Sequence, residues 1–162
     1  MRIGQGIDVH AFLEPGSANH IMLGGVEISH DRGVLAHSDG DVLIHALMDA
    51  LLGALGLPDI GHQFPDSDPK FSGANSMSLL ASVVALMVQA ALRIENLDAT
   101  VLLEAPKLVP YREAIIQSIA QALGCEQERV GLKATTTEKL GFIGRGEGIS
   151  AQVVVLLTSD PT

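Results

Sequence analysis

The stretch DGDVLIHALMDALLGAL, residues 39–55, predicts a helix with apolar residues on nearly every side. A helix of that composition belongs inside a protein rather than on its surface. Ser38 or Asp39 is the expected N-cap, and Gly56-Leu57-Pro58 is the expected stop. We therefore expect this helix to be buried in the fold.

Three polar residues interrupt this helix. Asp41, His45 and Asp49 follow one another at intervals of four and so form a single stripe along it. A polar stripe on a buried helix must be compensated, and a metal ion bound by His45 would do so. Asp49 would then accept the other imidazole N–H of His45 and fix the tautomer of the ring. The alternative is that the stripe is the one side of the helix that faces solvent.

The remaining elements follow from apolar periodicity and turn residues. Strands are predicted over 3–12, 21–28, 99–103, 130–135 and 149–158, and helices over 76–94, capped by Asn75, and 110–124, from Pro110 to Gly124. This order mixes hairpins with strand–helix–strand units. We expect an α/β (α+β) fold in which a mixed β-sheet packs with three main helices on one side, as a single domain over residues 1–162.

Composition and charge limit the classes of ligand that the protein is expected to bind. Apolar residues make up 47% of the chain, aromatic residues only 3%, and the formal net charge is −9. Such an acidic protein is a poor partner for nucleic acid or an anionic membrane. A phosphorylated small molecule remains possible if metal ions, backbone N–H groups and a few cations bind it. Met1-Arg2 leads straight into strand-like sequence, so a cytoplasmic protein is expected.

Asp8-Val9-His10 supplies two candidate metal ligands. The period of a strand places Asp8 and His10 on one face, and His45 of the predicted helix is the third candidate. A carboxylate with two imidazoles suits Zn²⁺, and three protein ligands leave a position open, as in catalytic zinc sites. With one anionic ligand, the site would keep a net positive charge and attract a phosphate oxygen.

Two further segments are typical of phosphate and polyol binding. His37-Ser38 lies at the expected helix start, where free N–H groups would cradle phosphate; the alternative is that Ser38 only caps the helix. Asp59-Ile60-Gly61 and residues 64–69 form an acidic stretch that would bind hydroxyl groups, or a plain solvated turn.

A third segment ends the strand predicted over 130–135. The hydroxyls of residues 135–137 would bind phosphate oxygens and Glu138 a second divalent cation, unless these threonines reflect β-propensity alone. Lys107 and Arg145 are candidate anion contacts because the chain has only 10 Lys and Arg residues.

Taken in order, these motifs resemble one family, the 2-C-methyl-D-erythritol 2,4-cyclodiphosphate synthases of the non-mevalonate isoprenoid pathway. The resemblance covers the whole chain. It rests on Arg2-Ile3-Gly4 through Asp8-Val9-His10, AHSDGD at 36–41, Asp59-Ile60-Gly61, Phe64-Pro65-Asp66, Ala105-Pro106-Lys107 and KATTTEKLGFIGRGEG at 133–148. The AHSDGD block and the last run are highly specific.

The resemblance implies a homotrimer with active sites between subunits. It implies Zn²⁺ on Asp8, His10 and His45, and Mg²⁺ or Mn²⁺ near Glu138. The implied substrate is 4-diphosphocytidyl-2-C-methyl-D-erythritol 2-phosphate. Its 2-phosphate attacks the β-phosphate, CMP leaves, and a cyclic diphosphate forms.

The resemblance also implies roles for individual residues. His37 and Thr136 would stabilise the transition state. Residues 103–109 and 134–136 would hold the cytidine and its phosphates, and Asp59, Gly61, Phe64 and Asp66 would line the methylerythritol pocket. The full implied substrate-binding set is Asp8, Val9, His10, His37, Ser38, Asp59, Ile60, Gly61, Phe64, Pro65, Asp66, Ser67, Asp68, Leu103, Glu104, Ala105, Pro106, Lys107, Leu108, Val109, Ala134, Thr135, Thr136, Thr137, Glu138, Phe142 and Arg145.

The sequence departs from the family pattern at two positions, and two other functions remain as alternatives. Gln5 and Ile7 stand where relatives often have His and Phe, so an isoprenoid-diphosphate ligand on the trimer axis is not implied. A metal-dependent phosphohydrolase would use the same zinc ligands but a water nucleophile. A non-catalytic metal- or nucleotide-binding trimer would bind ligand without turnover.

Overall fold

The computed structural model describes residues 1–65, 68–71 and 73–159, and its centre is a mixed β-sheet. Across these residues the main sheet has four strands in the order β1-β6-β4-β5. The strands are β1 (Arg2–Ala11), β4 (Leu92–Leu102), β5 (Val130–Thr135) and β6 (Gly148–Ser159). β6 pairs antiparallel with both β1 and β4, whereas β4 and β5 are parallel. The predicted mixed sheet is confirmed.

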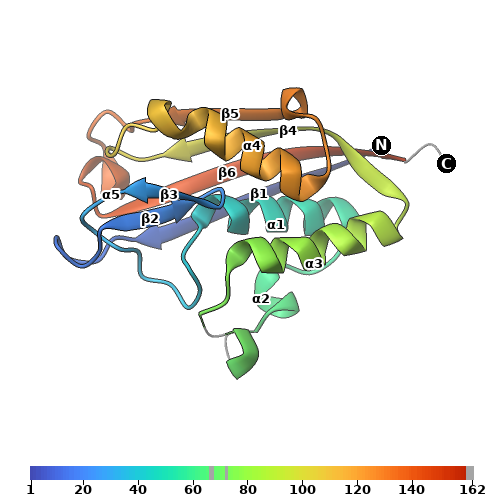
Figure 1. Ribbon diagram of the computed structural model, residues 1–162, viewed down its shortest axis with the longest axis horizontal. Helices are drawn as coiled ribbons and strands as arrows, with labels where there is room; N and C mark the ends of the chain where they lie inside the picture. The colour runs from blue at the N-terminus through green and yellow to red at the C-terminus, as the bar shows by residue number, and fades with distance from the viewer. Residues whose placement is uncertain (66–67, 72, 160–162) are drawn as a thin grey trace.

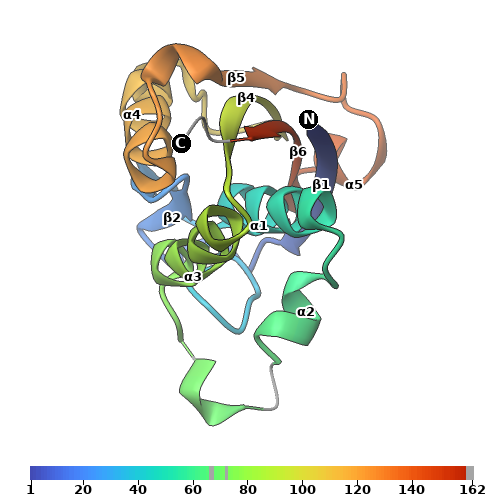
Figure 2. The ribbon, with the colours of Figure 1, turned by 90° about the vertical axis from the view of Figure 1, so that its right-hand side faces the viewer.

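Three long helices lie on one face of this sheet, as predicted (Figures 1 and 2). They are α1 (Val42–Leu55), α3 (Ser76–Gln89) and α4 (Arg112–Leu123). The shorter elements are α2 (Ile60–Gln63), α5 (Gly141–Gly144) and the 3-10 turns η1 (Pro69–Phe71), η2 (Val109–Tyr111) and η3 (Gln127–Arg129). α1 is the central helix, and eleven of its fourteen residues are buried.

The prediction of one strand over 21–28 is wrong. Two short strands, β2 (His20–Leu23) and β3 (Val26–Ser29), form a separate hairpin instead. Gly24 and Gly25 make its turn, with φ of 62° and 77°, in the left-handed region that glycine reaches without strain. Apolar residues lie on both sides of the turn, so the apolar pattern suggested a single continuous strand.

Helix α1 begins at Val42, three residues later than predicted. Its N-cap is Asp41 rather than Ser38 or Asp39, because the Asp41 carboxylate accepts the N–H of Ile44 at 3.1 Å. Gly56 ends the helix in the left-handed region, as predicted. Asp41 is fully buried, and burial raises its pKa. The carboxylate also accepts the N–H groups of Gly24 and Gly25, so it joins the hairpin turn to the helix.

The second long helix ends at Gln89, and the prediction that it runs to Ile94 is wrong. Ala91 has a φ of 52°, which stops the helix, and β4 begins at Leu92 rather than at Ala99. Its predicted cap is confirmed, because Asn75 accepts the N–H of Ser78 at 3.2 Å. The third helix starts at Arg112, after the η2 turn that contains Pro110.

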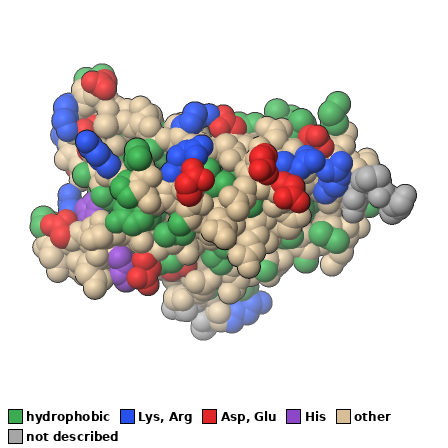
Figure 3. Space-filling model, turned by 45° about the horizontal axis from the view of Figure 1, so that its top comes forward, with side chains coloured by type: hydrophobic (Ala, Val, Ile, Leu, Met, Phe, Trp, Pro, Cys, Tyr) green, Lys and Arg blue, Asp and Glu red, His purple; other side chains and the backbone are tan. Residues whose placement is uncertain are grey.

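The face of the sheet away from the helices is uncovered in the single chain. Ile3, Ile7 and Val9 of β1 are 71%, 52% and 46% exposed, and Val154 of β6 is 41% exposed. Elsewhere, acidic and basic side chains are interspersed, without a broad basic patch on the face in view (Figure 3). Among the described residues, none of the helices has the length and apolar character needed to cross a bilayer.

Candidate metal centre

Strand β1 and helix α1 touch backbone to backbone, and this contact sets the site. A β-carbon on Gly4 would lie 1.9 Å from the carbonyl oxygen of Ala50, and one on Gly6 would lie 2.0 Å from that of Ala46. Only glycine allows so close an approach. The alternation of the strand continues the same face beyond the two glycines, to Asp8 and His10.

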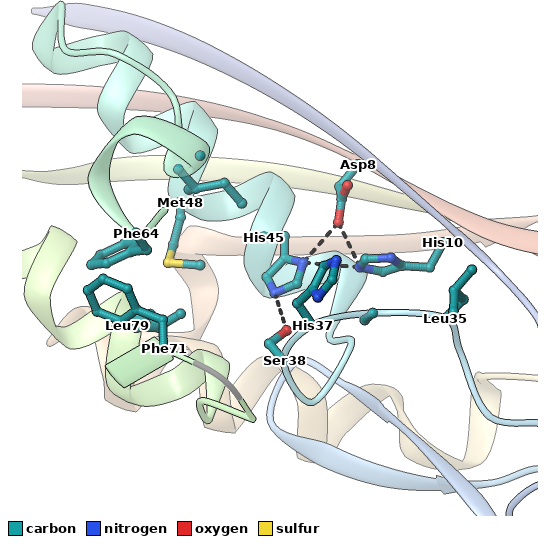
Figure 4. Close-up of a pocket in the computed structure, with 13 residues that line it drawn as sticks. Asp8, His10, Leu35, His37, Ser38, His45, Met48, Phe64, Phe71 and Leu79 are labelled. Atoms are coloured by element: carbon teal, nitrogen blue, oxygen red, sulfur yellow. Dashed lines mark hydrogen bonds and ion pairs between the residues drawn. The ribbon is translucent and has the colours of Figure 1, made fainter. Parts of the chain in front are cut away.

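The structure brings Asp8, His10 and His45 together (Figure 4). Asp8 Oδ2 lies 3.1 Å from His10 Nε2 and 3.0 Å from His45 Nδ1, and the two ring nitrogens are 3.1 Å apart. Around a tetrahedral Zn²⁺ with bonds of about 2.0–2.1 Å, ligand atoms lie about 3.3 Å apart. Protons cannot bridge all three pairs without placing two N–H groups or two lone pairs face to face. One cation could contact all three atoms, so the donor set fits a metal.

The charge state of Asp8 suits this role. Burial acts to raise its pKa, but the hydrogen bonds from His10 and His45 outweigh burial and hold the pKa of this carboxyl well below its ordinary value. The carboxylate is therefore ionised near neutral pH, as a metal ligand must be.

The second nitrogen of His45 has partners other than the predicted one. His45 Nε2 lies 2.9 Å from Ser76 Oγ and 3.1 Å from Ser38 Oγ. The prediction that Asp49 accepts from His45 is wrong, because Asp49 Oδ1 instead accepts the N–H of Ile60 at 2.9 Å. Burial raises the pKa of Asp49. The i, i+4 spacing placed Asp49 on the correct side of the helix, but α2 takes up its carboxylate.

Sequence reasoning missed Ser76 as part of the site. It is the first residue of α3 and is fully buried, 31 residues after His45 in the chain. A serine at a helix start reads as ordinary capping chemistry, so no signal in the sequence separates it from other serines.

A pocket of about 330 Å³ opens beside the three ligands. The polar side chains of His37 and Ser38 lie on one side of it, and an apolar wall lies on the other (Figure 4). The side chains that form this wall include Met48, Phe64, Phe71 and Leu79. An apolar wall facing a charged centre suits a ligand with a carbon skeleton and an anionic end.

The segment predicted to bind a polyol is only partly at this pocket. Ile60, Gly61 and Phe64 line it. Asp59 is outside the lining and caps α2, where it accepts the backbone N–H of His62 at 3.1 Å and lies 2.9 Å from its ring. Asp66 and Ser67 lie outside the described residues. Flanking them, the carbonyl of Pro65 accepts the N–H of Asp68 at 2.9 Å.

The predicted position of His37 and Ser38 at the start of the helix is wrong. The helix begins at Val42, and the side chain of Asp41 occupies its N-terminus. Ser38 Oγ accepts the N–H of Gly40 at 3.2 Å instead of capping the helix. His37 is exposed and lines the pocket next to the metal ligands.

Most of the other predicted binding residues lie toward the opposite edge of the sheet, after β4 and β5. The N–H of Leu103 donates to the carbonyl of Thr135 at 3.1 Å, and the N–H of Thr137 donates to Glu104 Oε1 at 3.2 Å. A second pocket, of about 270 Å³, lies there. It is lined by Leu108, Val109, Arg112, Leu132, Lys133 and Ala134.

Thr136 and Glu138 continue from this edge. Thr136 Oγ1 donates to Glu138 Oε1 at 3.2 Å, and both side chains are exposed. Phe142 is 42% exposed on α5, and Arg145 pairs with Glu147 at 2.8 and 3.0 Å. None of these four side chains lines the pocket beside the metal ligands.

The distance between the metal ligands on β1 and the binding segment that follows β5 can be estimated along one row of paired residues across the sheet. Asp8 pairs with Ala151, Ala151 with Val101, and Val101 with Ala134. Three strand intervals amount to about 14 Å. One chain therefore holds the metal ligands and the segment around Thr136 in the same row, but at opposite edges.

Known proteins resemble this chain over nearly its full length. A sequence model of the YgbB family matches residues 1–158. A 2-C-methyl-D-erythritol 2,4-cyclodiphosphate synthase from Alcanivorax borkumensis is 58% identical over 159 residues, which are 98% of each protein. Among solved structures, the CDP complex of IspF from Plasmodium falciparum is 35% identical with a TM-score of 0.86, over 99% of this chain and 97% of that one. Bifunctional IspDF from Campylobacter jejuni is 45% identical with a TM-score of 0.91, over 98% of this chain and 42% of that one.

Proposed function

The chain belongs to the YgbB family, that of the 2-C-methyl-D-erythritol 2,4-cyclodiphosphate synthases, and from this premise we propose how its own residues carry out the cyclisation. These enzymes are lyases of the non-mevalonate isoprenoid pathway. The observation that carries the proposal is the triangle of Asp8, His10 and His45 beside a half-apolar pocket. We also propose that the protein is a single domain and is located in the cytoplasm.

Asp8, His10 and His45 would hold Zn²⁺, whose chemistry when bound is to neutralise charge on a phosphate oxygen. The two imidazoles would bind as neutral ligands, and the ionised Asp8 would contribute the single negative charge. His37, beside them in the pocket, would donate to the phosphate that is attacked. Ser38 would hold the same phosphate group in place.

The substrate, 4-diphosphocytidyl-2-C-methyl-D-erythritol 2-phosphate, already contains its nucleophile. An oxygen of the 2-phosphate attacks the β-phosphorus, the bond to the bridging oxygen breaks, and CMP leaves with the electron pair. The protein must hold a flexible molecule with the attacking and leaving oxygens in line, which is worth roughly 7–11 kcal/mol. Ile60, Gly61 and Phe64 would hold the methylerythritol carbons, flanked by Asp59, Pro65, Asp66, Ser67 and Asp68.

The cytidine and its phosphates would bind at the opposite edge of the sheet. Residues 103–109 and 134–137 would hold them, and Leu108, Val109 and Ala134 of these line the second pocket. Glu138 would hold Mg²⁺ or Mn²⁺ with Thr136 beside it at the transition state. Phe142 and Arg145 would border the site from α5 and the residues that follow it, which lie beside β6 and the end of β1. A separation of about 14 Å within one chain is too long for a single diphosphate to bridge both edges.

A second copy of the chain would supply the missing edge. We therefore infer a homotrimer in which the metal ligands of one subunit face the 134–138 segment of a neighbour. The exposed apolar side chains of Ile3, Ile7, Val9 and Val154 support this assembly, because an uncovered apolar sheet face favours association.

Phosphorus NMR tests the proposal directly. The purified protein is mixed with the cytidylyl substrate and Mg²⁺, with and without a chelator, and the chelated sample is then resupplied with Zn²⁺ and Mg²⁺. Two coupled signals of a cyclic diphosphate together with CMP, lost on chelation and restored by the metals, are expected. Linear phosphate products would identify a phosphohydrolase, and an unchanged spectrum with metals present would leave only a binding role.

A further inference from the structure

A chain of hydrogen bonds runs from the back of His45 into the protein. His45 Nε2 lies 2.9 Å from Ser76 Oγ, and the hydroxyl of Ser76 donates in turn to Asp39 Oδ1. Ser76 is fully buried, so water does not compete for its hydroxyl. Neither Asp39 nor Ser76 belongs to the predicted metal-binding or substrate-binding residues.

The direction of this chain follows from the acceptor at its end. An ionised carboxylate only accepts hydrogen bonds, so the single hydroxyl proton of Ser76 points toward Asp39. The lone pairs of Ser76 Oγ then face His45 and require a proton on Nε2. A neutral imidazole has one ring proton, so Nδ1 keeps its lone pair, and Nδ1 is the atom that faces Asp8 and His10.

Asp39 is held firmly enough to impose this direction. Its Oδ2 accepts the backbone N–H of Ser76 at 2.9 Å, and its Oδ1 accepts the N–H of Asp41 at 3.3 Å. Its own N–H donates to the carbonyl of Ala74 at 3.2 Å. These bonds tie the loop before α1 to the start of α3, so both carboxylate oxygens have fixed orientations.

Ser38 does not provide the same control. Its Oγ lies 3.1 Å from His45 Nε2 and accepts the N–H of Gly40 at 3.2 Å. No described carboxylate hydrogen-bonds to this hydroxyl, which also lines the pocket. Its proton can turn either way and does not select a tautomer of His45.

We propose that Asp39, acting through Ser76, is a positioning residue that keeps the ring proton of His45 on Nε2 and thereby presents Nδ1 to the metal. This inference rests on the zinc site of the proposed function. Partners behind a metal-bound histidine typically change metal affinity by 10–100-fold when they are removed.

Substitutions of Asp39 and of Ser76 should have different effects on zinc binding. In Asp39→Asn, the new amide can donate to Ser76 Oγ, which then turns its proton toward His45 Nε2 and drives the ring proton onto Nδ1. This competes directly with metal binding, so zinc affinity should fall by roughly 10–100-fold. In Ser76→Ala, the link is absent rather than reversed, and the loss should be no larger than in Asp39→Asn.

The experiment measures zinc affinity by competition with a coloured chelator, on full-length protein stripped of metal. Ser78→Ala, at an exposed serine of the same helix, and Asp31→Asn, at an exposed carboxylate, are the matched controls and should bind zinc as the unmodified protein does. Ser38→Ala should lower zinc affinity less than Asp39→Asn. Circular dichroism tests whether each variant is folded. Because Asp39→Asn hardly changes the shape of the side chain, it still tests the proposal if Ser76→Ala does not fold.

A measurement on the zinc-loaded unmodified protein needs no variant. The Nε2 proton of His45 should give a slowly exchanging ring N–H signal in proton–nitrogen NMR, and Asp39→Asn should shift it or speed its exchange. Unchanged zinc affinity in both Asp39→Asn and Ser76→Ala, or a ring proton that exchanges freely in the unmodified protein, would overturn the proposal. Failure of the unmodified protein to bind stoichiometric zinc would instead refute the zinc site itself.

Discussion

Gly6 of β1 lies against Ala46 of α1 so closely that a β-carbon on Gly6 would come within 2.0 Å of the Ala46 carbonyl oxygen. Ala46 directly follows His45, and Gly6 lies two residues before Asp8 on the same strand face. The contact therefore sets the distance between the ligands of the helix and those of the strand. A helix held further from the strand would move His45 away from Asp8 and His10.

Gly6→Ala should both destabilise the protein and weaken its metal site. The new methyl group meets backbone rather than a flexible side chain, so the cost should reach about 3 kcal/mol, the upper end of overpacking effects. Urea unfolding and zinc stoichiometry measure the two effects. Gly53→Ala is the control, because its β-carbon would have no neighbour nearer than 3.9 Å and a helix interior favours alanine by about 1 kcal/mol. Equal stability of the two variants would contradict this account.

His45→Ala should remove most of the bound zinc and nearly all turnover, because only two ligands would remain. Metal content measured by atomic absorption, together with the phosphorus NMR assay, tests this. His20→Ala, at an exposed histidine whose ring contacts Asn19, should retain both properties. Full zinc occupancy in His45→Ala would exclude His45 as a ligand.

Glu138→Gln should spare zinc but raise the Mg²⁺ or Mn²⁺ concentration needed for half-maximal activity. The substitution removes one negative charge at the edge of the sheet opposite the zinc ligands and keeps the size of the side chain. Titration of activity against each cation is the measurement, with Glu128→Gln, an exposed site on η3, as the control. An unchanged cation requirement would rule out this role for Glu138.

Asp41→Ala should cost about 3 kcal/mol or more of unfolding free energy. The substitution leaves the N–H groups of Gly24, Gly25 and Ile44 without their acceptor, and each buried unsatisfied donor costs about 1–3 kcal/mol. Asp31→Ala, at an exposed carboxylate, should stay within about 0.5 kcal/mol. Urea midpoints that coincide for the two variants would show that the Asp41 bonds contribute little.

Glu104 should make the link between β4 and the 137–139 segment sensitive to acid. The hydrogen bond from Lys139 lowers the pKa of Glu104 below its ordinary value of 4.5 and outweighs burial, which acts to raise it. A lowered folded-state pKa means that the contribution to stability is present above about pH 4.5 and is lost as the pH falls through the folded value. The amide shift of Thr137, which donates to Glu104, should follow this titration. In Glu104→Gln the shift should no longer titrate in this range.

Periodicity and turn chemistry made much of the fold predictable. The long apolar run before Gly56 required a buried helix, and the strands β1, β5 and β6 were placed within a residue or two. The boundaries that were wrong depended on partners far along the chain. Asp41 became the cap of α1 because its carboxylate also receives Gly24 and Gly25, and β4 began early because Ala91 turns the chain.

The sequence by itself determined the chemistry of the candidate ligands. Alternation along a strand puts Asp8 and His10 on one face, and no element except a helix suits the residues around His45. Tertiary structure decided which groups support them. Asp49 points to α2, whereas Ser76 and Asp39 stand behind His45, because hydrogen-bond partners depend on how α1 and α3 pack. Local periodicity specifies the face of an element, but only packing specifies what that face meets.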